Sequence, residues 1–321
     1  MIKFISQKRH AGAASIFLSM KTPHYVDSIS VLHSTLGLKK PKHPLVSVVK
    51  LDDVVSALHR LEAFASYSYY CIALKLNFEG KMKYGQQYFD FNEGVMTFTA
   101  PKQVIQIEAL SPVPVTGYLL MAHPDFFLSY PLATKIKEYG FFSYAVHEAL
   151  HLSDTEETMI ADMMQNIERE IAAPIDSFSQ DVIVSHIDLL LNYANRFYNR
   201  QFITRKTANN DILIKLETVL EEYFNSDKIE QAGPPSVQYI AGKLHISPNY
   251  LSDMLRAHTG QNTKQHIQTR LLDKAKELLT TTSLSVAEIA YRLGFEFPQS
   301  FNKLFKSKTN VSPREYRQSY Q

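Results

Sequence analysis

The chain of 321 residues is 45% hydrophobic and 12% aromatic, which predicts two folded domains and excludes wholesale disorder. Its single cysteine, Cys71, excludes a disulfide framework and a cysteine-rich zinc site, and it fits a reducing cytoplasm. The net charge of +2 is uneven, because residues 236–321 hold twelve Lys and Arg against six Asp and Glu. A basic C-terminal module is typical of proteins that bind the phosphate backbone of nucleic acid, although a basic solvated surface has the same composition.

The first forty residues contain one apolar run, from Ala11 to Met20, which Lys21 closes. The run is about half as long as a bilayer requires, and no small-residue cleavage site follows it. We therefore expect a cytoplasmic protein that neither spans a membrane nor is exported.

Residues 45–127 have the pattern of short strands. Residues 70–79 alternate apolar and polar side chains, and further short runs follow at 84–91, 95–99, 104–109 and 116–122, with turn residues between them. This spacing predicts an antiparallel barrel or jelly roll. Aromatic residues of this region could line a small-molecule pocket inside it or pack in its core. They are Tyr67, Tyr69, Tyr70, Tyr84, Tyr88 and Phe89.

Two helices are predicted after the strands. Ser153 and Glu156 form a capping-box sequence that opens a helix running toward Ile171. The second helix is predicted from about Gln180 to Tyr198, and its apolar residues recur at a spacing of four and three. That spacing favours pairing with a helix of a second copy, and the alternative is that the stripe covers the barrel. The stripe consists of Ile183, Ile187, Leu190, Ala194 and Phe197.

Residues 203–210 are mostly polar and are predicted to link an N-terminal domain, 1–202, to a C-terminal domain, 211–321. The second domain is predicted to begin with a helix from Asp211 to Phe224. Further on, Ile267, Leu271, Ala275, Leu278 and Leu279 mark one apolar face of a long helix.

The C-terminal region contains an internal repeat, with an offset of 49 residues before a turn and 50 after it. Each copy has the features of a helix-turn-helix unit. A small residue, Ala241 or Ala290, lets the second helix cross closely over the first, and the turn that follows requires a positive φ. Gly294 suits that turn, and His245 is tolerated there. The matched pairs are Ile240/Ile289, Ala241/Ala290, Leu244/Leu293, His245/Gly294, Leu251/Phe301, Leu255/Phe305, Arg256/Lys306 and Thr259/Thr309.

The long helix between the two copies would fix their separation. If that separation is about 34 Å, one turn of B-DNA, both units can enter successive segments of the major groove on one side of a duplex. Two copies in register, in the basic part of the chain, therefore predict a DNA-binding domain.

Residues 246–252, 287–295 and 311–317 resemble the DNA-binding domain of AraC/XylS-type bacterial transcription regulators, and the resemblance extends over 211–321. The strand-rich first half with its paired helices is more loosely similar to the cupin-like effector-binding and dimerisation domain of that family. The resemblance implies an α+β chain: a cupin-like β-barrel (jelly roll) with following helices, and then an all-α domain of two tandem helix-turn-helix units.

The resemblance also implies which side chains face DNA bases: Asn249, Ser252 and Asp253 in the first unit, and Gln299, Asn302 and Lys303 in the second. Asn and Gln can bind adenine, and Lys can reach guanine. Asp253 departs from the basic residue usual in the family, and its carboxylate could accept a hydrogen bond from cytosine. The residues expected to contact phosphates are Lys243, Arg256, Arg292 and Lys306.

The partners implied are double-stranded promoter DNA, RNA polymerase, a small-molecule effector in the barrel and a second copy of the chain. No cofactor is implied, and whether the protein activates or represses stays open. A small-molecule-binding protein that contacts DNA incidentally is an alternative from another class.

An enzymatic alternative rests on residues 147–151, which fit the zinc-protease pattern H-E-x-x-H. That chemistry requires both histidines on one helix and a third ligand, for which Glu168 could be proposed. Ser153 opens a new helix two residues after His151, so we interpret the motif as packing. A metal-binding cupin would require a His-x-His pair in the strand region, and none occurs there. A DNA-repair methyltransferase would require several cysteines.

Overall fold

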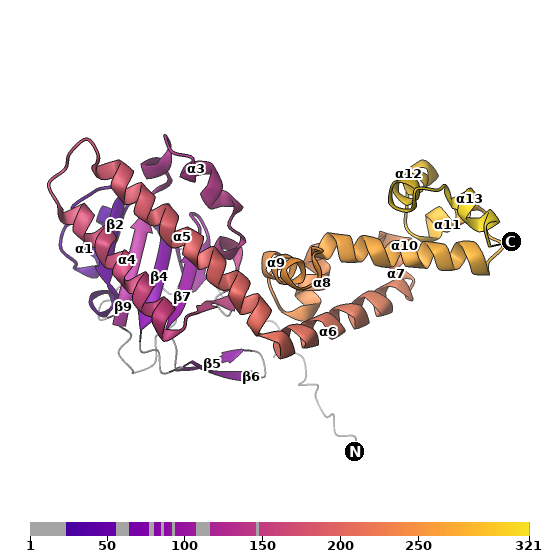
Figure 1. The fold of residues 1–321 in the computed structure, drawn as a ribbon, viewed down its shortest axis with the longest axis horizontal. Helices are drawn as coiled ribbons and strands as arrows, with labels where there is room; N and C mark the ends of the chain where they lie inside the picture. The colour runs from indigo at the N-terminus through magenta and orange to yellow at the C-terminus, as the bar shows by residue number, and fades with distance from the viewer. Residues whose placement is uncertain are drawn as a thin grey trace, which may run out of the picture.

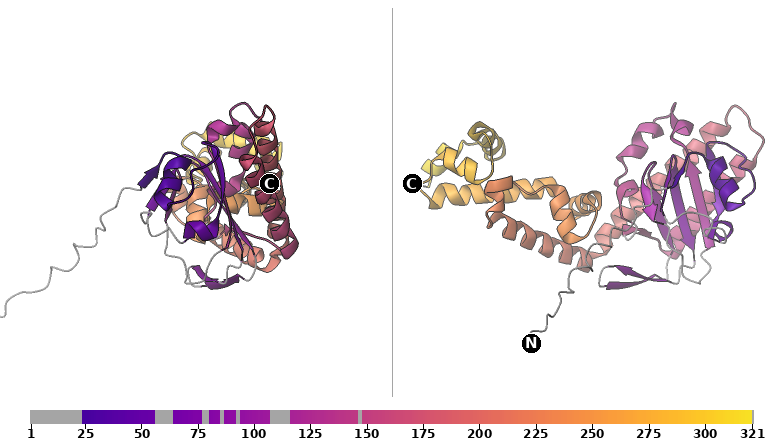
Figure 2. Two further views of the ribbon diagram at one scale, coloured as in Figure 1. Left: turned by 90° about the vertical axis from the view of Figure 1, so that its left-hand side faces the viewer. Right: turned by 180° about the vertical axis from the view of Figure 1, so that it is seen from behind.

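The computed structural model describes residues 24–55, 64–76, 80–84, 87–91, 94–106, 116–145 and 148–320. A β-rich N-terminal part and a helical C-terminal part follow one another along an elongated molecule (Figure 1). Seen from behind in Figure 2, the strands gather at one end and the last helices at the other. Within these ranges, no helix is long and apolar enough to cross a membrane.

The described strands form three sheets. The largest is antiparallel, with the order β10-β7-β4-β9-β2, and a three-stranded sheet (β1-β3-β8) and a hairpin (β5-β6) accompany it. The strands are β1 (His24–Val26), β2 (Val46–Lys50), β3 (Phe64–Tyr67), β4 (Tyr70–Leu76), β5 (Gly80–Tyr84), β6 (Gln87–Phe91), β7 (Val95–Thr99), β8 (Val104–Gln106), β9 (Thr116–Ala122) and β10 (Leu150–His151).

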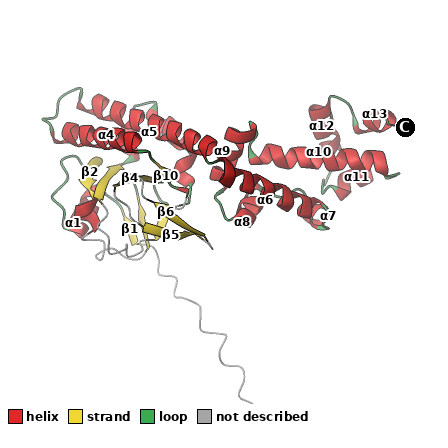
Figure 3. Ribbon diagram, turned by 60° about the horizontal axis from the view of Figure 1, so that its bottom comes forward, coloured by secondary structure: helices red, strands yellow, loops and turns green. Residues whose placement is uncertain are grey.

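The five-stranded sheet is buried on both faces, because alternate residues of its strands enter different cores. On one face Ile72 and Leu120 pack against α4 (Asp154–Ala172) and α5 (Ser179–Thr204). Figure 3 shows these two helices side by side over the strands. On the other face Met121 joins a smaller core with residues of α1 (Ile29–Leu36), α2 (Leu51–Val55) and the three-stranded sheet.

The predicted cupin-like barrel is not confirmed, since the described strands form open sheets and no closed barrel. The period of two was interpreted correctly as strands with a buried face. In a jelly roll a second sheet would cover that face, whereas here α4 and α5 cover it. Both arrangements satisfy the same alternation of side chains.

The individual strand predictions have mixed outcomes. The runs at 95–99 and 116–122 are confirmed as β7 and β9. The run at 84–91 is divided between the end of β5 and β6, and residues 107–109 lie outside the described ranges. Of the six aromatic residues considered for a pocket, Tyr67, Tyr69 and Tyr70 are buried in the two cores. The side chains of Tyr84, Tyr88 and Phe89 lie outside the described set.

The two helices after the strands are confirmed. The backbone N–H of Ser153 donates to Glu156 Oε2 at 3.0 Å, the capping-box contact that opens α4. The assignment of the apolar stripe of α5 to a dimer contact is corrected, because all five residues are 0–5% exposed within a single chain. They pack on the sheet and on α4, which was the alternative. The stripe is Ile183, Ile187, Leu190, Ala194 and Phe197.

The polar segment 203–210 is helical at every position except Arg205, so it is not an extended linker. Helix α6 (Lys206–Phe224) begins five residues before the predicted start and ends as predicted. Asn209, within this first part of α6, is buried and donates to the carbonyl of Phe202 near the end of α5 at 2.5 Å. Polar residues of this segment thus join two helices.

Replacing Leu190 with Ala tests the assignment of the α5 stripe. Leu190 is fully buried, so Leu190→Ala should lower the free energy of unfolding by about 2–5 kcal/mol. The matched control is Leu189→Ala, one residue away and 45% exposed, which should cost at most about 0.5 kcal/mol. Denaturant unfolding measures both, and equal costs would contradict the packing of this face on the sheet.

Candidate nucleic-acid interface

The first helix-turn-helix unit consists of α8 (Val237–Leu244) and α9 (Pro248–Thr259). Ala241 is buried where the helices cross. His245 ends α8 with φ 57° and ψ 38°, which confirms the left-handed turn predicted for it. Ser247 caps α9, its Oγ accepting from the N–H of Tyr250 at 3.2 Å, and Pro248 is the first helical residue.

The second unit consists of α11 (Val286–Arg292) and α12 (Pro298–Thr309). Ser285 and Glu288 form a capping box at the start of α11, and these hydrogen bonds lower the pKa of the Glu288 carboxyl. Gly294 turns the chain with φ 76°. The tandem repeat inferred from the sequence is therefore present as two helix pairs.

Helix α10 (Thr263–Thr281) separates the two units, as predicted. Its 19 residues span about 28 Å at 1.5 Å per residue. Ile267, Leu271, Ala275 and Leu279 are buried, which fixes its inner face. In Figures 1 and 3 the two units lie at opposite ends of this helix, so α9 and α12 do not pack on each other.

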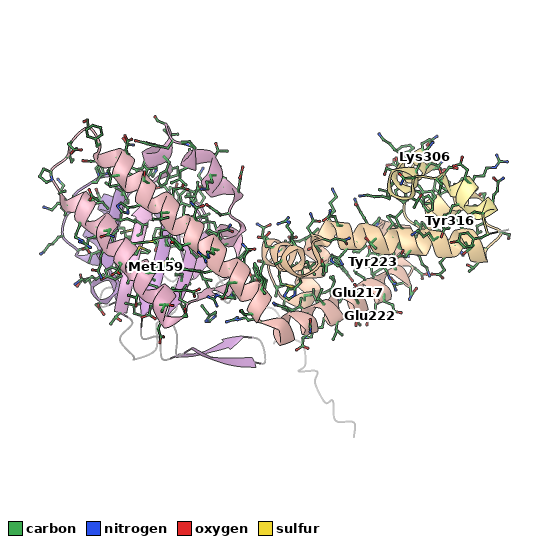
Figure 4. All side chains as sticks on the ribbon, in the orientation of Figure 1. Met159, Glu217, Glu222, Tyr223, Lys306 and Tyr316 are labelled. Carbon is green, nitrogen blue, oxygen red and sulfur yellow. The ribbon has the colours of Figure 1, made fainter. Side chains whose placement is uncertain are left out.

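Three further contacts hold the C-terminal helices together. Tyr223 of α6 donates to the carbonyl of Gly233 at 2.9 Å, after the short helix α7 (Lys228–Ala232). Tyr316 of α13 (Pro313–Gln318) packs on Phe305 with ring centres 5.5 Å apart, and Figure 4 labels both tyrosines. Arg317 Nε donates to the carbonyl of Leu279 at 3.0 Å, which ties the last helix to α10.

The predicted base-facing residues of the second unit lie on one exposed face of α12. Gln299, Asn302 and Lys303 have the spacing of three and four that aligns side chains on a helix, and all three are exposed.

The corresponding residues of the first unit have different surroundings. Asn249 is exposed, whereas Ser252 and Asp253 are half-buried. Ser252 Oγ lies 3.0 Å from Oγ1 of Thr263. The Asp253 carboxylate accepts from the hydroxyl of Tyr144 at 2.7 Å and from Nη1 of Arg256 at 2.8 Å. The two units are thus unequal in this structure.

The four residues predicted to contact phosphates are all exposed: Lys243, Arg256, Arg292 and Lys306. Lys306 is labelled on the second unit in Figure 4. Lys243 Nζ lies 5.9 Å from the centre of the Tyr239 ring, and Arg256 is paired with Asp253.

A contact between the two parts of the chain was not foreseen from the sequence. Glu148 is 4% exposed, and its carboxylate accepts from the backbone N–H of Ser247 at 2.6 Å and from Ser247 Oγ at 2.5 Å. Tyr144 contacts Asp253 nearby, and burial together with that carboxylate raises the pKa of its hydroxyl, which keeps it a hydrogen-bond donor. No local sequence pattern reveals partners about a hundred residues apart.

The zinc-protease alternative is not supported by the geometry of the described residues. His151 lies in strand β10, so the motif does not lie on one continuous helix, which agrees with the argument from the sequence. His147 lies outside the described ranges. Burial, and then the charges of Arg205 and Arg200, lower the pKa of His151 to about 3. Among the described residues, no group of three or more His, Cys, Asp or Glu side chains is placed to hold a metal ion.

Comparison with known proteins agrees with this geometry. Residues 240–319 match the family described as "Helix-turn-helix domain". The "Uncharacterized HTH-type transcriptional regulator YfiF" of Bacillus subtilis is 25% identical over 268 residues, 79% of this chain and 78% of that protein. The "HTH-type transcriptional activator RhaS" of Salmonella schwarzengrund is 34% identical over 120 residues, 37% of this chain and 41% of the activator. The match therefore spans less than half of the activator's length.

Among solved structures, a transcriptional regulator from Chromobacterium violaceum described as containing an AraC-type DNA-binding domain is 24% identical. The match covers 36% of this chain and 96% of that one, with a TM-score of 0.31.

Two helix-turn-helix units joined by one helix define the chain as a tandem helix-turn-helix protein. More narrowly, the two relatives reported above are both described as HTH-type transcriptional regulators or activators, and the chain is similar to them.

Substitution of Gly294 tests the closely packed turn of the second unit. A Cβ there would lie 2.3 Å from the Cα of Gly233 and from the carbonyl oxygen of Ile229, both backbone atoms. Gly294→Ala should therefore lower the free energy of unfolding by about 3 kcal/mol or more, from strain and displacement together. Gly260→Ala is the control, because Gly260 has φ 73° but no atom within 4 Å of its added Cβ. It should cost only about 1 kcal/mol. Thermal unfolding distinguishes them, and equal losses would refute the packing of this turn.

Proposed function

We propose that the protein is a sequence-specific transcription regulator that binds double-stranded promoter DNA through α9 and α12. The observation that carries this proposal is the placement of two helix-turn-helix units at opposite ends of α10. This helix is about 28 Å long and has one buried face. That length is comparable to the 34 Å between successive major-groove segments on one side of a duplex. The exposed polar face of α12 and the basic charge of residues 236–321 support it.

Within this function, we assign base contacts to Gln299, Asn302 and Lys303 and, when the first unit is engaged, to Asn249, Ser252 and Asp253. Phosphate contacts are assigned to Lys243, Arg256, Arg292 and Lys306, which set the position of the domain along the duplex. Contact with RNA polymerase remains a proposal that rests on the family resemblance, and the cytoplasm remains our prediction for the protein's location.

Control by a small molecule and assembly into a homodimer also remain proposals. A cavity of about 750 Å³ between α1, β2 and the end of α4 is large enough for an effector, and the residues that line it include Lys39, Lys40, Lys42 and Lys50. It lies beside the sheet and not inside a barrel. A dimer contact cannot use the buried stripe of α5 without unfolding that helix from the sheet.

Selection of bound duplexes from a random pool tests the proposed function. The full chain should recover a defined motif with two informative blocks about one helical turn apart for each protomer. Weak binding that ignores sequence would instead favour the alternative of a small-molecule-binding protein that contacts DNA incidentally.

Lys303 and Lys306 should have separable effects on that motif. Lys303→Ala should relax the base preference within one block, by about 1–3 kcal/mol of discrimination, because its side chain lies on the exposed face assigned to bases. Lys306→Ala should weaken binding to all sequences alike and reduce the slope of log affinity against log salt by about one.

Titrations of matched and mismatched duplexes at several salt concentrations measure both effects. Lys215→Ala, exposed on α6, removes the same charge outside the two units and serves as the control. Equal effects of Lys303→Ala and Lys306→Ala on every duplex would remove the distinction between base contact and phosphate contact.

A further inference from the structure

We propose that the N-terminus of α9 is an anion site that Glu148 and a DNA phosphate occupy alternately, so that the first helix-turn-helix unit engages DNA only after Glu148 leaves. This rests on the proposed function, since it concerns how the same DNA-binding surface is regulated. The occupant in this structure is the carboxylate of the N-terminal domain.

The chemistry of the site is that of a helix start. The first N–H groups of a helix have no partner inside the helix, and the helix dipole adds positive potential there, so anions bind well. Glu148 takes this place on the twelve-residue helix α9, accepting from both the N–H and the Oγ of its cap residue, Ser247. It also accepts from the N–H of Ala145 on its own side at 2.6 Å. Donors from two parts of the chain therefore share one buried carboxylate.

Phosphate groups are the other anions suited to such a site, because backbone N–H groups at helix starts are regular phosphate contacts in protein–DNA complexes. A phosphate and the Glu148 carboxylate cannot accept from the same two donors at once. Their like charges would also repel at that distance. Binding of DNA at this end of α9 therefore requires the carboxylate to withdraw.

Residues near Glu148 also contact Asp253 on the predicted base-facing side of the same helix, where Asn249 stays exposed. Tyr144 donates to Asp253, and Gly140 lies so close that an added Cβ would come within 2.2 Å of Oδ2 of Asp253. The ring of Tyr250 packs edge-on against Tyr144 and Phe202, with ring centres 5.3 and 5.2 Å away. Polar and apolar contacts thus hold α9 against the N-terminal domain.

In the described structure, no comparable contacts hold the second unit's helix α12, so the two units of one chain can be compared with each other. Its helix α12 begins after Phe297, which provides no side-chain cap, and its three base-facing residues are exposed. The full chain is therefore expected to bind the DNA block of the second unit freely and that of the first unit against the cost of releasing Glu148.

Glu148→Gln in the full chain tests the exchange. The neutral amide keeps the size of the side chain but loses the charge-assisted hydrogen bonds to Ser247. The contact that holds α9 against the N-terminal domain therefore weakens. Affinity for a duplex that contains both selected blocks should rise about tenfold, whereas affinity for a shorter duplex that ends before the first block, and so lacks its phosphates, should not change. The probe is the duplex recovered by selection with the wild-type chain, and fluorescence anisotropy gives the dissociation constants.

Two further variants make the result decisive. Tyr144→Phe removes only the hydroxyl that holds Asp253 and should raise affinity for the two-block duplex about threefold, which tests the same docking if Glu148→Gln unfolds early in thermal melts. Asp162→Asn, exposed on α4, changes net charge by the same amount as Glu148→Gln and should leave both affinities unchanged.

The outcomes separate this proposal from the proposed function. Equal affinities of wild type, Glu148→Gln and Tyr144→Phe for the two-block duplex would overturn the exchange of anions, and so would an equal gain from Asp162→Asn. If no duplex is recovered or bound with sequence preference by any form, the proposed function itself fails.

Discussion

The apolar side of α5 makes the contact on which both parts of the molecule depend. Through most of its length, residues such as Ile187 and Leu190 cover the five-stranded sheet. Near its end, Tyr198 and Phe202 belong to an aromatic cluster that reaches Tyr250 on α9. Packed interiors do not deform continuously, so a change in how α5 lies on the sheet would alter the surface that receives α9. One helix thereby connects the β-rich part to the start of the DNA-binding part.

The sequence predicted correctly those elements whose structure depends only on residues close together in the chain. The capping box at Ser153, the alternation of β7 and β9 and the turns at His245 and Gly294 are each encoded by neighbouring residues, and each is found where the pattern put it. The barrel could not be predicted correctly, because alternation states only that a face is buried and not what covers it. The same limit explains why the α5 stripe was assigned to a dimer contact. A spacing of four and three shows that a helix face is buried, but it does not show whether a second copy or the chain's own sheet covers that face.

The helix-turn-helix units could be predicted because they repeat, whereas the residues assigned to base contacts came from the family resemblance. The structure shows that those of α12 lie exposed on one helix face, and their contact with bases stays a prediction. The partners of Ser247 and Asp253 were beyond sequence reasoning, since Glu148 and Tyr144 are brought to them by the tertiary structure alone. Glu148 attracted attention for another reason, as part of a short motif resembling a zinc site. Its observed role as a helix-capping carboxylate has no signature of its own at such sequence separation.

The family resemblance implies a basic residue at position 253, and this chain has Asp253 there. The contacts that hold α9 against the N-terminal domain, here called the docked state, give a reason for the difference. A carboxylate so near the DNA would be repelled by phosphates, which is a cost to the first unit. Within the chain, however, the same carboxylate is the acceptor that the buried hydroxyl of Tyr144 requires, and a lysine or arginine could only donate there. Loss of that acceptor would leave a buried donor unsatisfied, which is more costly than the weak net gain of an average hydrogen bond. Asp253 therefore favours the docked state in two ways, by holding Tyr144 and by making DNA a poorer competitor. In the exchange proposed above an anion would satisfy the start of α9 in both states, so this contact would contribute little to the free-energy difference that a ligand has to reverse.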